Sequence, residues 1–189
     1  HAIESYISLG GNEYSNGLSL HAVKLIGKYL RRAVANGNDL EAREKMAYAQ
    51  TIAGIAFSNA GVGSVHALAH PLSSFYNIAH GDANSLMLPY VMKYCQIACM
   101  EKLGEIGSAL GVDTRDLNEV EAADAAIDAI KRLSSDVGIP PTLTAMANAR
   151  GLKINKKDIE SMAADGMKDV CTGFNPRVPT IQDYIALYN

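Results

Sequence analysis

Residues 61–84 read GVGSVHALAHPLSSFYNIAHGDAN and contain three of the five histidines of this 189-residue chain. Two glycines interrupt the chain before a stretch with helical spacing. This stretch is predicted to be a helix with Ser64 as its N-cap. His66 and His70 are four residues apart, so they share one face of that helix and could chelate one ion. This HxxxH pattern is a weak signal, because many structural helices contain it.

His66 and His80 are separated by 14 residues, which on a straight helix is a distance of roughly 21 Å. Both can reach one metal ion only if the chain doubles back between them. Pro71 removes a backbone donor, and residues 76–79 with Gly81 offer a place to bend. The clustering alone leaves two interpretations open: a metal or catalytic site, and ordinary core or surface histidines. His21, alone on a helix face, is expected to be structural.

Outward from this segment, nearly every periodic stretch shows helical spacing, and no β-branched residues alternate with polar ones. The sequence therefore predicts an all-α fold, with residues 1–189 forming a single domain. Residues 40–58 are rich in alanine, so this helix is expected to be central and buried. Asp82 is the expected N-cap of the helix that follows His80. The other expected helices cover about residues 1–8, 18–35, 82–99, a stretch ending at 111, 118–137, 143–149, 158–164, and a last one starting at 180.

The composition is 48% apolar, which suits one substantial core. The 17 basic and 20 acidic residues give a formal charge of −3 without a long run of one sign. Nucleic-acid and anionic-membrane partners are therefore not expected, and no apolar stretch approaches the roughly 20 residues of a membrane helix. Cys95, Cys99 and Cys171 form no disulfide framework, which favours a reduced, cytoplasmic setting. The first two share a helix face, and we interpret them as packing residues.

Several stretches together resemble the iron-containing (group III) alcohol dehydrogenase family, and within it the branch that contains lactaldehyde reductase and 1,3-propanediol dehydrogenase. They are HAIE at 1–4, FSNA at 57–60, HALAHP at 66–71, FYN at 75–77, HGDAN at 80–84, LPYVM at 88–92, DVCT at 169–172 and NPR at 175–177. The resemblance implies the helical C-terminal domain of the dehydroquinate synthase-like fold. On this basis we expect an N-terminal α/β nucleotide-binding domain to be absent from the chain. We also expect the chain to begin at a metal-ligand histidine, without the ligand aspartate four residues upstream.

The resemblance also implies roles for individual residues. By position, His1, His66 and His80 match the family's three histidine ligands of a divalent ion. His70 matches an additional active-site histidine beside the metal and the nicotinamide cofactor, so the resemblance overrules the chelate suggested by the HxxxH spacing. Phe57 and Cys171 are placed along the substrate pocket. The implied cofactors are Fe²⁺, with Zn²⁺ as an alternative, and NAD(P) held mainly by the missing N-terminal domain.

The implied activity is the interconversion of small primary alcohols or diols and aldehydes by hydride transfer, in a homo-oligomeric enzyme. The isolated chain is expected to be inactive, because hydride transfer needs the nucleotide-binding domain. Gly61 and Gly63 do not replace that domain's glycine-rich turn, since no strand precedes them. Two alternatives remain open: a zinc-dependent relative similar to glycerol dehydrogenase, and a helical module without catalysis of its own.

Overall fold

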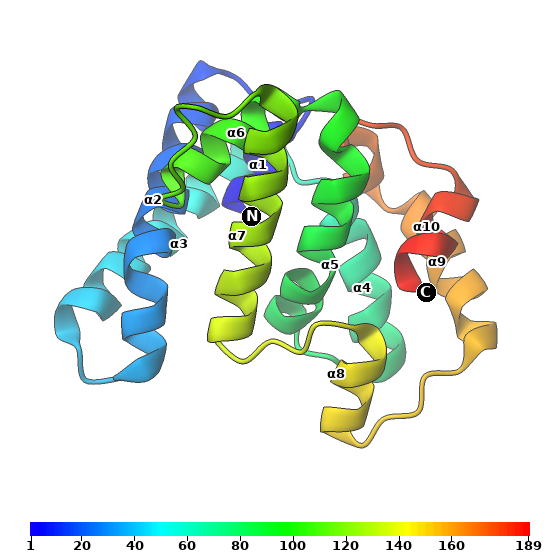
Figure 1. Ribbon diagram of the computed structural model, residues 1–189. Helices are drawn as coiled ribbons and strands as arrows, with labels where there is room; N and C mark the ends of the chain where they lie inside the picture. The colour runs from blue at the N-terminus through cyan, green and yellow to red at the C-terminus, as the bar shows by residue number, and fades with distance from the viewer.

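The computed structural model describes residues 1–189 as ten α-helices and two short 3-10 turns, without a strand (Figure 1). This confirms the predicted all-α class. The helices are α1 (Ala2–Ile7), α2 (Glu13–Ala35), α3 (Leu40–Ala60), α4 (Ser64–Tyr76), α5 (His80–Cys95), α6 (Met100–Ala109), α7 (Glu119–Asp136), α8 (Leu143–Arg150), α9 (Lys156–Lys168) and α10 (Ile181–Tyr188). The 3-10 turns are Gln96–Ala98 and Val170–Phe174.

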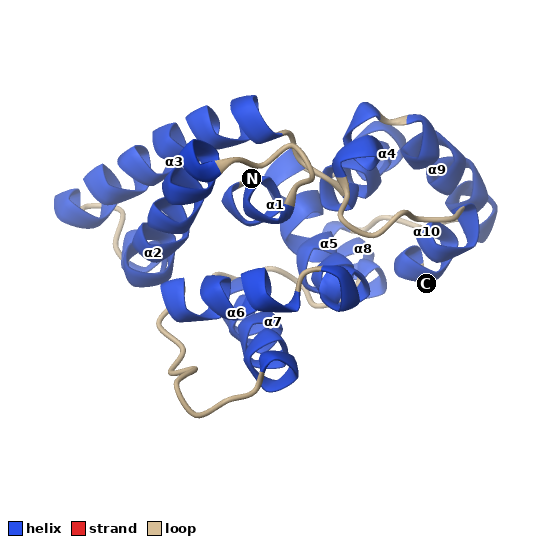
Figure 2. Cartoon of the chain, turned by 90° about the horizontal axis from the view of Figure 1, so that it is seen from above, coloured by secondary structure: helices blue, strands red, loops and turns tan.

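The helices pack largely as pairs around a shared core. Helix α2 packs along α3, α6 along α7, and α4 against both α5 and α9. Seen from above, the α2–α3 pair lies on one side of the molecule and α4, α9 and α10 on the other, with the short α1 between them (Figure 2). One cluster of 32 buried residues has members from all ten helices. Helix α1 contributes Ala2, Tyr6 and Ile7 to this cluster, so the two sides of the molecule share one core.

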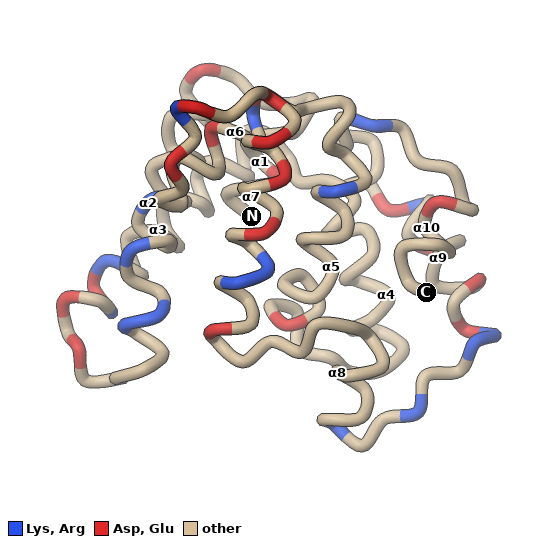
Figure 3. Tube along the Cα trace, viewed as in Figure 1, with Lys and Arg blue, Asp and Glu red and all other residues tan.

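Helix α4 is the central element of this core. Eight of its residues are buried, including His66, Leu68 and Leu72. It has no Lys, Arg, Asp or Glu, whereas both signs of charge are spread over the surrounding helices (Figure 3). An uncharged helix with apolar residues on most of its faces is typical of a fully surrounded position.

Helix α3 is not central, so the sequence-based expectation was wrong on this point. Five of its six alanines are buried, Ala49 and Ala56 completely, whereas Ala47 is exposed. Its other face is open, with Leu40 79% and Tyr48 52% exposed. Alanine shortens the distance between two helices on the face where they touch. It does not require that the helix be covered on all sides.

The two N-caps predicted around the histidines are also wrong. Ser64 is the first residue of α4 and Gly63 is the N-cap, without a side-chain hydrogen bond of its own. Helix α5 starts at His80, with Ala79 as its N-cap, so Asp82 lies within the first turn. At α4, side chains from distant elements bind the free backbone N–H groups, which a local reading of the sequence does not reveal.

Pro71 lies inside α4, and the bend follows later. Asn77 adopts a left-handed conformation with φ 52° and ends the helix. Pro71 has no N–H to donate to the carbonyl of Ala67. On the same side, α9 approaches so closely that a Cβ atom on Gly166 would lie 3.0 Å from the Ala67 carbonyl oxygen. The left-handed Asn77 confirms the predicted bend at residues 76–79. Pro71 does not end the helix but lies inside it.

No single helix is both long and apolar enough to cross a membrane. The pair α3 and α4 meets that criterion only when both are counted together, and the two are bent by 108° at the break between them.

Candidate metal centre

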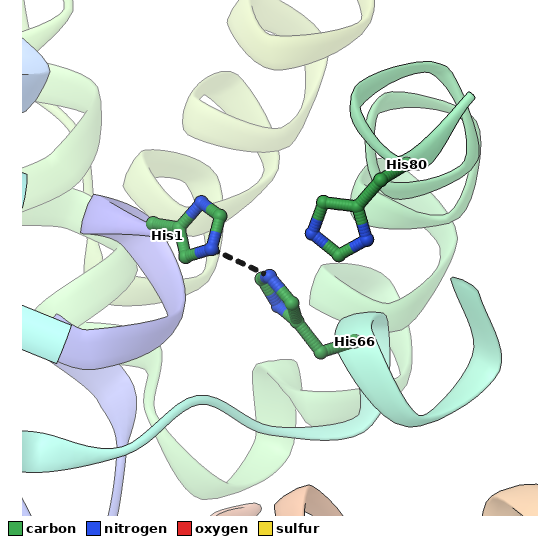
Figure 4. Close-up of side chains that lie close together, drawn as sticks. All are labelled: His1, His66 and His80. Carbon is green, nitrogen blue, oxygen red and sulfur yellow. Dashed lines mark hydrogen bonds between the residues drawn. The ribbon is translucent and has the colours of Figure 1, made fainter. Parts of the chain in front are cut away.

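Three histidine side chains from three separate segments point toward one another (Figure 4). His1 precedes α1, His66 lies in the first turn of α4, and His80 starts α5. One ring nitrogen from each lies within 4.8 Å of the other two, and the Nε2 atoms of His1 and His66 are 3.0 Å apart. The sequence-predicted trio is thus brought together in space.

The turn after α4 produces this convergence. The chain leaves α4 at the left-handed Asn77 and reaches α5 within three residues. The ring centroids of His66 and His80 are consequently 5.2 Å apart, in place of the separation of a straight helix. The predicted doubling back between these two histidines is confirmed.

A buried carboxylate holds His66 from the side opposite the other histidines. Glu4 of α1 is 1% exposed and His66 is 3% exposed. The Glu4 Oε2 atom forms a short hydrogen bond with Nδ1 of His66. Its Oε1 atom accepts from the backbone N–H groups of Val65 at 2.7 Å and Gly63 at 3.1 Å. Because Nδ1 is engaged with Glu4, Nε2 is the atom that faces His1.

His80 is held at the exposed side of the cluster. The side-chain amide nitrogen of Asn84, one turn later, lies 3.0 Å from His80 Nε2 and 2.9 Å from the His80 carbonyl oxygen. Partial burial, together with the nearby His66, His70 and the amino terminus, lowers the pKa of His80. A lowered pKa favours the neutral imidazole, which is the form that binds metal ions.

His70 lies beside the trio and has its own partner. Its Nδ1 atom is 2.7 Å from Oδ2 of Asp169, and its ring is nearly parallel to that of His80 at a centroid distance of 5.6 Å. Burial alone would raise the pKa of Asp169, but hydrogen bonds from His70 and Cys171 hold it below its usual range. The His70 ring therefore adjoins the cluster while Asp169 fixes its orientation.

The two residues predicted to line the pocket lie at different ends of the cluster. The ring centroids of Phe57 and His1 are 4.4 Å apart. Cys171 is buried and donates its backbone N–H to Asp169, the partner of His70. Burial and the neighbouring Asp169 raise the pKa of the Cys171 thiol to about 12, so the side chain is a neutral thiol near pH 7.

A largely apolar cavity of about 170 Å³ opens beside His1. It is lined by residues of α1, α2, α5 and α7, including Ile3, Val23 and Leu88. Neither Phe57 nor Cys171 lines this cavity, so their predicted role in a substrate pocket stays a prediction.

The whole chain, residues 1–189, matches the model of the Fe-containing alcohol dehydrogenase family, C-terminal. The chain belongs to the iron-containing alcohol dehydrogenase family. This iron-containing alcohol dehydrogenase domain is 42% identical to lactaldehyde reductase of Escherichia coli strain K12, over 100% of the chain and 47% of that protein. It is also 42% identical to NAD-dependent methanol dehydrogenase of Bacillus methanolicus, over 97% of the chain and 46% of that protein.

Among solved structures, a crystal structure of 1,3-propanediol oxidoreductase superposes with a TM-score of 0.94 at 42% identity, covering 100% of this chain and 48% of the other. These similarities confirm the family and the helical C-terminal fold that the sequence predicted. The chain spans about half the length of the curated relatives that it matches.

The donor set of this alcohol dehydrogenase domain fits a divalent transition metal. The Nε2 atoms of His1 and His66, 3.0 Å apart, share a hydrogen bond when one of them carries a proton, and when both are unprotonated their lone pairs are close enough to bind one cation together. Nitrogen ligands at about 2.1 Å in a tetrahedral site are roughly 3.4 Å apart, close to the observed separation. The carboxylate on Nδ1 of His66 is the arrangement that metal-binding histidines commonly have.

Reasoning from the sequence missed two residues of the site, Glu4 and Asp169. Glu4 is the only acidic residue of α1 and lies three positions after His1. Asp169 lies two positions before Cys171. Neither spacing indicates a contact with His66 or His70, because those contacts join segments 62 and 99 residues apart.

Proposed function

We propose that the chain is the metal-binding part of an NAD(P)-dependent alcohol dehydrogenase that interconverts small primary alcohols or diols and aldehydes by hydride transfer. The observation that carries this proposal is the convergence of His1, His66 and His80 within 4.8 Å. It agrees with the family, whose members similar to this chain are named for methanol, lactaldehyde and 1,3-propanediol. The proposed metal ligands are these three histidines.

The proposed metal is Fe²⁺, which is the metal in the family's name. Bound there, a divalent ion would act as a Lewis acid on the alcohol or carbonyl oxygen. Three imidazoles do not by themselves select iron, because zinc binds such nitrogen donors more tightly. A zinc-dependent relative similar to glycerol dehydrogenase is therefore the second candidate.

His70 is the proposed proton carrier. Because Asp169 accepts the hydrogen bond of Nδ1, Nε2 is the atom that can exchange a proton with the substrate hydroxyl and with solvent. The side chain is 43% exposed, so water has access to it. Phe57 beside His1 and Cys171 beside His70 would exclude water from the reacting carbon and hold the substrate between them.

The nicotinamide cofactor is assigned mainly to a nucleotide-binding domain outside this chain. The name of the methanol dehydrogenase relative specifies NAD, and the chain covers 46% of that protein. Residues 1–189 alone are accordingly expected to show no dehydrogenase activity, which is the alternative of a helical module without catalysis. A homo-oligomeric state of the complete enzyme is part of the same proposal.

The test compares two substitutions in the complete protein. His66→Ala should lose both the bound metal and alcohol oxidation, because a buried ligand is removed. His70→Ala should keep the metal and lose turnover. His21→Ala, on the exposed face of α2, is the matched control and should change neither.

Two results would contradict the assignment. Full metal occupancy in His66→Ala would remove this residue from the ligand set, and full turnover in His70→Ala would exclude it as proton carrier. Adding Fe²⁺ without oxygen, or Zn²⁺, to the metal-free protein separates the two candidates. Activity with Zn²⁺ alone would favour the zinc-dependent relative.

A further inference from the structure

The geometry points to Glu4 as the residue that sets the tautomer of His66, keeping the proton on Nδ1 and leaving Nε2 free to bind a metal ion. This positioning role extends the proposed function and rests on His66 being a ligand. It concerns α1 and the start of α4, two elements that the sequence separates by more than fifty residues.

The hydrogen bonds around Glu4 make it an acceptor. Its Oε1 accepts from the N–H groups of Gly63 and Val65, and its Oε2 lies 3.3 Å from the backbone nitrogen of His66. Backbone N–H groups only donate, so both oxygens already serve as acceptors for them. Glu4 is 1% exposed, so its carboxylate is shielded from bulk solvent.

This acceptor character decides where the ring proton of His66 lies. Nδ1 faces Oε2 of Glu4, and a neutral imidazole has one protonated and one unprotonated nitrogen. With Nδ1 donating to Glu4, the lone pair lies on Nε2. That atom is the one 3.0 Å from Nε2 of His1, inside the candidate metal centre.

Replacing Glu4 by glutamine should reverse this arrangement. Oε1 accepts from two backbone N–H groups, those of Val65 at 2.7 Å and Gly63 at 3.1 Å, whereas the only backbone contact of Oε2 is the longer one of 3.3 Å with the His66 N–H, so the amide oxygen takes the place of Oε1. The amide nitrogen then takes the place of Oε2 and donates to Nδ1 of His66. The ring proton moves to Nε2, and the metal-binding atom is blocked in a side chain of nearly unchanged shape.

Glu4 also caps α4, so a purely structural role must be separated from the positioning role. Asn175 offers the matched control. It is 2% exposed, and its side-chain oxygen accepts from the backbone N–H of Ser64 at 3.1 Å, at the same helix start. Its side chain makes no hydrogen bond to His66. Asn175→Ala should therefore weaken the start of α4 without changing the tautomer.

The experiment records ring-nitrogen NMR spectra of the metal-free 189-residue chain labelled with ¹⁵N-histidine, with the His66 signals assigned by their loss in His66→Ala. The unaltered chain and Asn175→Ala should both show His66 protonated at Nδ1. Glu4→Gln should show it protonated at Nε2. Titration with Co²⁺ should show a loss of affinity of roughly 10- to 100-fold in Glu4→Gln, and a much smaller one in Asn175→Ala.

Two outcomes would overturn the inference. One is an unchanged Nδ1-protonated ring in a folded Glu4→Gln. The other is a loss of Co²⁺ affinity in Asn175→Ala as large as that in Glu4→Gln. The spectra need no metal, so they test Glu4 separately from the proposed function. If the tautomer reverses while the unaltered chain binds no Co²⁺, the positioning by Glu4 holds and the ligand role of His66 fails.

Discussion

Nδ1 of His70 lies 2.7 Å from Oδ2 of Asp169, a residue 99 positions later in the chain. The other oxygen of Asp169 accepts from the backbone N–H of Cys171 at 2.9 Å, which fixes the carboxylate at the start of the Val170–Phe174 turn. His70 is therefore held by a carboxylate that is itself held by backbone. Its ring plane stays nearly parallel to that of His80.

Asp169→Asn tests this relationship in the complete protein. Turnover should fall by roughly 10- to 100-fold, by analogy with the carboxylates that orient metal-binding histidines. The metal content per chain should be unchanged, because Asp169 makes no hydrogen bond to the three proposed ligands. Steady-state kinetics and elemental analysis measure the two effects.

Asp165→Asn is the control for Asp169→Asn. Asp165 lies in α9 and its only ion pair is an exposed one with Lys168 at 4.0 Å, so turnover should be unchanged. Equal kcat values for Asp169→Asn and the unaltered enzyme would show that His70 does not need this carboxylate.

The all-helical class follows from local patterns, which is why the sequence predicts it. Helical spacing and caps such as Asn118 and Thr180 are local, and both residues cap their helices through side-chain hydrogen bonds. The position of α3 was mistaken because burial depends on what packs against each face. Alanine content indicates only a close approach on one of them.

In the candidate site, too, the features encoded by neighbouring residues were predictable, and the contacts between distant elements were not. The bend near Asn77 is encoded locally, so the approach of His66 to His80 was predictable. The carboxylates of Glu4 and Asp169 were not, because their partners come from other helices. The Ser64 cap failed for the same reason, since Glu4 and Asn175 bind the N–H groups at the start of α4.

A metal ion that binds the three histidines should stabilise the folded chain. At a free Zn²⁺ concentration of 100 times the dissociation constant, the free energy of unfolding should rise by about 2.7 kcal/mol. Denaturant unfolding of the chain with and without Zn²⁺ measures this rise. His80→Ala should remove most of the effect, because one of the three nitrogen donors is lost.

His21→Ala provides the control for the Zn²⁺ experiment. It removes one imidazole from the exposed face of α2 and leaves the trio intact, so the rise should persist in full. A rise that survives in His80→Ala would mean that Zn²⁺ binds elsewhere.

Two glycine substitutions should have opposite effects on stability. In Gly166→Ala the added Cβ would lie 3.0 Å from the carbonyl oxygen of Ala67 and 3.2 Å from the ring of Tyr184, so α9 must move away from α4. We expect a loss of roughly 1–3 kcal/mol in the free energy of unfolding. In Gly54→Ala nothing lies within 4 Å of the new Cβ, and the helix interior gains up to about 1 kcal/mol.

Urea unfolding of both variants measures these changes under the same conditions. The pair is informative because the chemical change is identical and only the surroundings differ. Equal effects of the two substitutions would mean that the close contact of α9 with α4 does not limit packing at Gly166.

The buried cysteines should make the fold sensitive to alkali. Burial raises the pKa of Cys95 to about 11 and that of Cys99 to about 12, from an ordinary value of 9.0. Because the folded pKa is the higher one, the unfolded chain releases these protons first as the pH rises. Stability from the protonated thiols is complete below pH 9.0 and is lost as the pH rises toward 11. For Cys95 the full loss is on the order of 3 kcal/mol.

Urea unfolding of the reduced protein between about pH 8 and pH 9.5 measures the first part of this loss, at pH values below the ordinary tyrosine pKa of about 10. Cys95→Ala should unfold more readily at every pH, because its side chain is completely buried. Its free energy of unfolding should nevertheless fall less steeply with pH, because the variant lacks one of the thiols whose pKa is raised in the folded chain. Comparing slopes separates the proton effect from the packing effect. Identical slopes would show that the Cys95 thiol ionises in the folded chain as easily as in the unfolded one.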